Sequence, residues 1–223
     1  MTDVRFHFDV MCPWAYQTYK WVEAAATQRD INVTLHFFSL EERNWKAGQK
    51  HPWERPWSFG WSLLRIAAWL ERHRGGNQAV SDFYVVAGRM LHEEGTAVQT
   101  PQGAREVLRA MNISPDIADE ALNSDWTNDR VRDAHRAAVD LGVHGVPTLL
   151  IDDEHLLFGP VITPAPLGQA AAELWDLVGA WTRTPHLYKL QRVKTDAEQQ
   201  HIVRSFEPFR IARESATREV LGR

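Results

Sequence analysis

The chain has 223 residues, a formal net charge of −4 and 44% hydrophobic residues, enough for one sizeable core or one core with an inserted subdomain. The slightly acidic balance argues against a nucleic-acid partner, because phosphate binding needs a dense basic surface. The sequence has no apolar run long enough to span a membrane, and no basic segment followed by an apolar one at its start. We therefore expect a cytoplasmic protein with no membrane partner.

The first forty residues predict a strand, a helix and a second strand. Val4, Phe6 and Phe8 alternate with polar residues, which is typical of a half-buried strand. A helix follows over about 13–27, because proline suits the first helical position and the segment is rich in alanine and aromatic residues. Residues 31–37 alternate again. The order indicates a βαβ unit with parallel strands.

The rest of the chain divides into a helical block, a hairpin and a tail. Only helical periods recur over 41–142, and a last helix over 128–142 leads back toward the core. Short runs at 148–151 and 154–158 predict an antiparallel hairpin, followed by a helix over 167–181. We therefore predict a discontinuous α/β core of 1–40 and 143–185, with 41–142 as a helical insertion. Residues 186–223 form a charged C-terminal tail of weak helical character.

Cys12 is the chain's single cysteine, so no disulfide can form within one chain. It lies where a predicted strand ends and a helix begins, and the free N–H groups and helix dipole there favour an anion. We expect a thiol with a lowered pKa that is reactive at neutral pH. The alternative is an inert thiol buried at the end of a strand.

Two segments carry a resemblance to a known family. Cys12-Pro13-Trp14-Ala15 resembles the Cys-Pro-Trp-Cys motif of DsbA-like thioredoxin-fold proteins, and Val146-Pro147-Thr148 resembles their cis-proline loop. The pattern is most similar to the cytoplasmic DsbA-like reductases that work with mycothiol. Further residues shared with that branch are Phe8-Asp9, Ser39-Leu40, Asn44, Phe158-Gly159-Pro160-Val161, Leu174-Trp175-Asp176 and Pro185-His186.

The resemblance implies a thioredoxin-like α/β fold with an all-helical insertion, a homodimer, no bound cofactor and a low-molecular-weight thiol as co-substrate. It also implies that Pro147 is cis, so that the polar backbone groups of Val146 face the thiol. Trp14 and Asn44 would contact substrate, although Asn44 also suits a turn or a helix cap. His144 precedes Pro147 by three residues, and either approaches the thiol or lies in a surface turn.

An aromatic group opens the helical block and allows two interpretations. Its members could line a pocket for a flat aromatic substrate, or they could pack the helices onto the core, which is the interpretation we favour. The group consists of Trp45, Trp53, Trp57, Phe59 and Trp61. The ten histidines show no metal-ligand spacing, so we predict no metal site.

Ala15 replaces the second cysteine of the motif, which excludes a dithiol cycle within one chain. We therefore predict a monothiol oxidoreductase, in which Cys12 exchanges with mycothiol or glutathione and acts on a disulfide or a small aromatic substrate. One alternative is a thiol S-transferase or isomerase similar to kappa-class glutathione transferases and 2-hydroxychromene-2-carboxylate isomerases. The other is a non-catalytic protein that binds small molecules on a thioredoxin fold.

Overall fold

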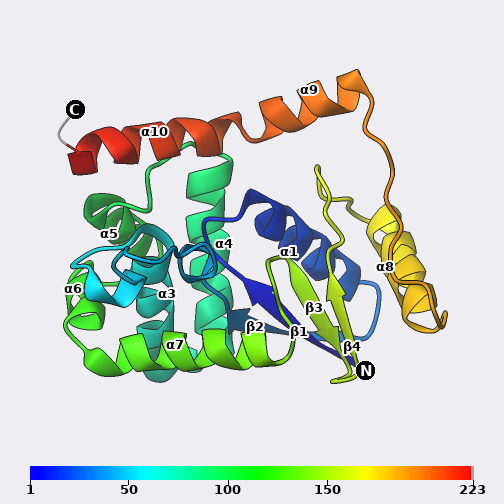
Figure 1. Cartoon of the computed structure of the whole chain (residues 1–223), viewed down its shortest axis with the longest axis horizontal. Coiled ribbons are helices and arrows are strands. Elements are labelled where there is room, and N and C mark those ends of the chain that lie inside the picture. The colour runs from blue at the N-terminus through cyan, green and yellow to red at the C-terminus, as the bar shows by residue number, and fades with distance from the viewer. Residues whose placement is uncertain (222–223) are drawn as a thin grey trace.

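A four-stranded sheet organises the computed structural model, which describes residues 1–221 (Figure 1). The strand order is β2-β1-β3-β4. β1 pairs in parallel with β2 and antiparallel with β3, and β3 pairs antiparallel with β4. The predicted βαβ unit and the predicted hairpin are both confirmed. The strands are β1 (Thr2–Phe8), β2 (Ile31–Phe37), β3 (Thr148–Ile151) and β4 (His155–Phe158).

Two helices belong to the α/β core, α1 (Pro13–Ala26) and α8 (Gln169–Thr182). Their bounds lie within two residues of the predicted ones. Trp21 joins them, because its ring packs against Trp175 with centroids 6.0 Å apart and its indole N–H donates to the Ala171 carbonyl at 2.9 Å. Trp21 is fully buried, so this contact fixes α1, and with it the start of the helix, against the core.

Six α-helices lie between β2 and β3, which confirms a thioredoxin-like α/β fold interrupted by helices. The helix predicted at 128–142 corresponds to α7, and the exact division at 41 and 142 stays a prediction. A single 3₁₀ turn (Pro52–Glu54) and a π turn (Glu71–Gly75) complete this region. The helices are α2 (Leu40–Arg43), α3 (Phe59–Leu70), α4 (Asn77–His92), α5 (Pro101–Ala110), α6 (Ile117–Leu122) and α7 (Asp125–Asp140).

The C-terminal segment is more ordered than its charge suggested. It forms α9 (Asp196–Ser205) and α10 (Glu207–Leu221), which run back along one side of the molecule (Figure 1). A capping box between Thr195 and Glu198 starts α9. Among residues 1–221, no helix is long and apolar enough to cross a membrane.

Gly103 makes a tight contact at the start of α5, and we expect Gly103→Ala to destabilise the fold. An added Cβ would lie 2.1 Å from the Ala97 carbonyl oxygen, and backbone cannot yield as a side chain can. We expect a loss of about 3 kcal/mol in the free energy of unfolding, measured by urea denaturation.

Gly179→Ala is the matched control for that experiment, because Gly179 also lies in a helix. Its added Cβ would meet only the flexible end of Arg183, at 3.2 Å. Alanine favours a helix over glycine by up to about 1 kcal/mol, so this variant should be neutral or more stable. Equal midpoints for the two variants would contradict the steric argument.

Candidate active site

Cys12 caps the first helix at the end of the first strand. Its Sγ accepts a hydrogen bond from the Ala15 N–H at 3.4 Å, and its S–H donates to the Val146 carbonyl at 3.4 Å. Pro13 at the first helical position needs no N–H partner, which lets the helix begin directly after the cysteine. The thiol is 6% exposed and therefore nearly closed off from water.

The loop before β3 supplies the wall opposite the thiol. Antiparallel pairing of β3 with β1 brings this loop beside the end of β1, although 134 residues separate Val146 from Cys12. The Val146–Pro147 peptide bond is cis. Among the described residues, none accepts a hydrogen bond from the Val146 N–H. The Val146 carbonyl therefore stands beside the thiol, and the N–H of the same residue is left without a partner among the described residues, so an extended thiol-bearing chain could pair with this residue.

Asp9 lies beneath the cysteine loop, next to Met11. Its side chain is fully buried, and its carboxyl oxygens accept from the Met11 N–H at 2.8 Å and the Leu40 N–H at 2.6 Å. It therefore ties the Cys12 loop to the segment after β2. Burial raises the pKa of Asp9 to about 7, and those two hydrogen bonds oppose the shift. No signal in the sequence indicated this burial, because Asp9 occupies a polar position in the alternating pattern of residues 4–10.

The expected lowering of the Cys12 pKa is wrong for this structure. Burial raises the pKa of the thiol to about 11, the Ala15 N–H opposes this, and the nearby Asp9 raises it further. The helix start favours a thiolate as expected, but removing the sulfur from water outweighs it. In this structure the thiol therefore stays protonated at neutral pH.

The rate at which Cys12 is alkylated in the free protein should therefore keep rising with pH and reach no plateau near pH 7. Iodoacetamide reacts with the thiolate, so the rate should rise about tenfold per pH unit from pH 7 to 10. Stopped reactions read by intact mass would measure it, with Cys12→Ser as the background control. A rate that levels off near pH 7 would show that the helix start dominates over burial.

The remaining residues of the motif and the proposed substrate contacts differ in their surroundings. Ala15 is fully buried, while Trp14 is half-buried and packs edge-to-face on Phe206. Asn44 is exposed and caps the C-terminus of α2, its amide donating to the Leu40 carbonyl at 2.8 Å. Asp9 holds the Leu40 N–H, so Asn44 belongs to a segment that is anchored beneath the cysteine loop.

His144 has a packing partner away from the cysteine motif. Its ring stacks on Phe158 of the hairpin, with centroids 5.0 Å apart, and its carbonyl accepts from Arg43. These contacts fit the surface-turn interpretation better than a role at the thiol.

Most of the aromatic group packs on itself and on neighbouring helices. His51 lies between the Trp45 and Trp53 rings, with centroids 4.4 Å from each and nearly parallel planes. Trp61 is buried and its indole donates to Asn128 in α7, at 2.8 Å. Trp45 is 36% exposed. These side chains therefore contact one another and α7, which favours the packing interpretation.

Comparison with solved structures identifies the fold class. The probable DsbA oxidoreductase SCO1869 of Streptomyces coelicolor superposes with a TM-score of 0.58 at 17% identity, covering 87% of this chain and 95% of that one. A 2-hydroxychromene-2-carboxylate isomerase gives 0.57 at 18% identity, over 81% and 95%. The cytosolic disulfide reductase DsbM of Pseudomonas aeruginosa, solved with GSH, gives 0.54 at 17% identity, over 82% and 100%. The protein thus has the DsbA-like thioredoxin fold.

Sequence comparison identifies the family within that class. Residues 11–192 match the model of the Rv2466c-like family, described as mycothiol-dependent nitroreductase Rv2466c. The chain belongs to this family of thiol-dependent oxidoreductases. It is also 44% identical over 210 residues to the uncharacterized protein Rv2286c of Mycobacterium tuberculosis, covering 94% of this chain and 90% of that protein.

Proposed function

We propose that the protein is a monothiol oxidoreductase in which Cys12 exchanges with a low-molecular-weight thiol, mycothiol in the first place. One observation carries the proposal: the only thiol of the chain stands at a helix start against the carbonyl of Val146, a residue whose N–H has no partner among the described residues. The description of the family supports mycothiol as that thiol.

The reaction balances without a second cysteine. The Cys12 thiolate attacks a disulfide R–S–S–R′, the mixed disulfide Cys12–S–S–R forms, and R′–S⁻ leaves and takes up a proton. A mycothiol thiolate then attacks the R sulfur, which returns the Cys12 thiolate and releases R joined to mycothiol. A second mycothiol frees R–SH and leaves mycothiol disulfide. Two thiols are oxidised and one disulfide is reduced.

The residues around the sulfur support specific steps. The Ala15 N–H and the start of α1 stabilise the Cys12 thiolate as leaving group in the second step, once the site is open to water. The Val146 backbone would hold the incoming thiol in strand-like pairing, and Trp14 would contact the group R. Asp9, with its pKa near 7, can take up or release a proton beneath the loop.

Intact-mass spectrometry of the protein mixed with mycothiol disulfide or glutathione disulfide tests the proposal. We expect one adduct per chain on Cys12, formed faster with mycothiol disulfide, and none on Cys12→Ser. Absence of both adducts, while a small alkylating reagent still modifies Cys12, would reject the exchange reaction. Faster reaction with glutathione disulfide would support the exchange reaction and identify glutathione, not mycothiol, as the preferred thiol.

A nitro compound is the other substrate to assay, because the family description names that activity. Two mycothiols would supply two electrons, giving a nitroso compound, mycothiol disulfide and water. Consumption of thiol at two equivalents per nitro group reduced to nitroso is the expected stoichiometry.

The raised pKa of Cys12 favours one second candidate, an S-transferase or isomerase. A thiol that stays protonated at neutral pH suits a site that binds and activates an external thiol without being oxidised. In that case turnover would proceed with no mixed disulfide at any time, and thiol would not be consumed as disulfide.

A further inference from the structure

The C-terminal helices lie outside the region that matches the family, which ends at residue 192. After α8 the chain runs through residues 183–195 without a helix or strand, and then α9 and α10 run along one side of the molecule, past α1 and α4 (Figure 1). This segment therefore adds a structural layer to the core that the family model describes.

The start of α10 packs directly on the active-site motif. Phe206, between α9 and α10, meets Trp14 edge-to-face, with ring centroids 4.6 Å apart and planes at 85°. Phe209 packs on His92 at 5.3 Å, and the buried His92 ring bonds to the Val10 carbonyl at 2.9 Å. Both aromatic side chains thus reach the loop that carries Cys12, one through Trp14 and one through His92.

The inner face of α10 is anchored further along by small and polar groups. Ala212 and Ala216 are fully buried, and the Gln99 amide donates to the Ala212 carbonyl at 3.0 Å. The residues of this contact are uncharged, so no ionised side chain is removed from water where Ala212 and Ala216 pack. The helix is held as an amphipathic element against α4 and the loop after it.

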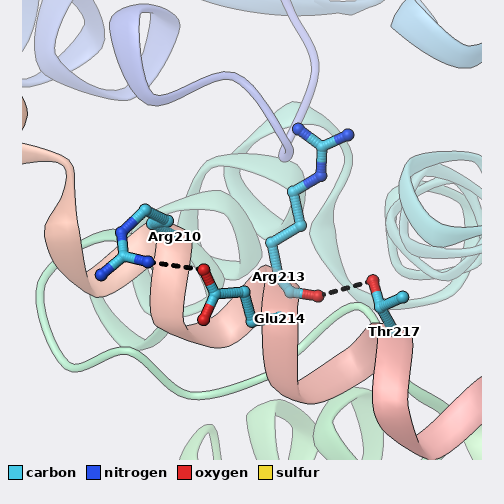
Figure 2. Close-up of a pocket in the computed structure, with 4 residues that line it drawn as sticks. All are labelled: Arg210, Arg213, Glu214 and Thr217. Carbon is cyan, nitrogen blue, oxygen red and sulfur yellow. Dashed lines mark hydrogen bonds and ion pairs between the residues drawn. The ribbon is translucent and has the colours of Figure 1, made fainter. Parts of the chain in front are cut away.

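The outer face of α10 is polar. Arg210 pairs with Glu207 and Glu214, and an open recess lies among Arg210, Arg213, Glu214 and Thr217, where Arg213 extends away from the helix (Figure 2). All four residues of this recess come from one helix, so it does not enclose a ligand. α10 therefore has one face toward the site and one face toward solvent.

The segment that connects α8 to α10 makes fewer buried contacts than α10 does. Tyr188 is 86% exposed and Val193 is 89% exposed, and α9 has no buried residue. The Trp181 indole, which donates to the Leu187 carbonyl, marks the last contact with α8. Residues 188–195 can therefore change direction at little cost in packing.

We propose that Phe206 and the first turn of α10 form a removable cover over the Trp14–Cys12 site, hinged at residues 188–195. Phe206 occupies one contact surface of Trp14, so it has to move away before a bulky molecule can contact Trp14 and reach the thiol. The cover is part of this chain and needs no partner. The proposal concerns access to Cys12, and it holds whether or not mycothiol is the thiol used.

The rate at which Cys12 reacts with the bulky disulfide DTNB, relative to small iodoacetamide, tests the cover. Phe206→Ala removes the edge-to-face pair, and we expect the DTNB rate to rise about three- to tenfold. The control is Val203→Ala in α9, which is 67% exposed and should leave the rate unchanged. An unchanged DTNB rate in folded Phe206→Ala would overturn the proposal.

Hydrogen exchange on the unsubstituted chain gives a second test that does not depend on the variant folding. When Cys12 carries the nitrothiobenzoate group from DTNB, amides of residues 206–212 should exchange faster than in the free protein. Unchanged protection there, with the adduct confirmed by mass, would also overturn the cover. Neither test uses mycothiol, so a failure of the proposed reaction and a failure of the cover are told apart.

Discussion

Replacing Cys12 with serine should abolish thiol-dependent turnover and leave the fold intact. The thiolate is the nucleophile and a serine hydroxyl does not ionise at neutral pH, so we expect a loss of about a thousandfold or more in kcat/KM. Turnover of mycothiol, followed as disulfide formed per chain, is the measurement.

Serine is the better replacement because Cys12 is also a helix cap. Its Sγ accepts from the Ala15 N–H, and serine is among the preferred residues at this position, whereas alanine loses about 1 kcal/mol. Cys12→Ser should therefore unfold at the same urea concentration as the parent, within error, and Cys12→Ala somewhat earlier. Undiminished formation of mycothiol disulfide by Cys12→Ser would reject Cys12 as the nucleophile of the exchange.

Restoring the second cysteine with Ala15→Cys should convert the site to a dithiol site. The Ala15 N–H already contacts the Cys12 sulfur at 3.4 Å, so a sulfur at position 15 lies within reach of any mixed disulfide on Cys12. An internal thiol competes with external thiol at a far higher effective concentration, and we expect the adduct with mycothiol to disappear at least about a hundredfold faster.

Ala15→Ser is the control for that variant, since Ala15 is fully buried and any larger side chain costs packing energy, about 1–3 kcal/mol. Rapid quenching with acid and intact-mass analysis would follow the adduct with time. An adduct that persists equally in Ala15→Cys and Ala15→Ser would mean that the two positions cannot form a disulfide in this site.

Local patterns were enough to predict the core of the fold. The alternation of Val4, Phe6 and Phe8 reflects a strand with buried neighbours, and the apolar run after Pro147 reflects the hairpin. Both patterns depend on residues close in sequence. The identity of Cys12 as the candidate nucleophile rests on the same kind of signal, a thiol between a strand and a helix.

The features that the sequence analysis missed depend on contacts between distant residues. The raised pKa of Cys12 results from burial, which we considered only as the alternative to a reactive thiol, because the residues beside Cys12 do not show what covers it. Phe206 meets Trp14 from the far end of the chain, and Ala212 and Ala216 dock a helix whose overall composition is charged. Asp9 holds the cysteine loop against the segment after β2 through a hydrogen bond from the N–H of Leu40, a residue 31 positions away in the chain.

The position of β1 in the sheet also determines when the protein can complete its folding during synthesis. β1 lies between β2 and β3, so the edge of residues 4–7 that pairs with β3 has no strand partner until residues 148–151 have left the ribosome. Helices α2–α7 form from nearer contacts and are made in the interval. The nascent chain therefore carries an open strand edge through most of its translation, and the cysteine loop at the end of β1 acquires its Val146 wall only when β3 closes that edge.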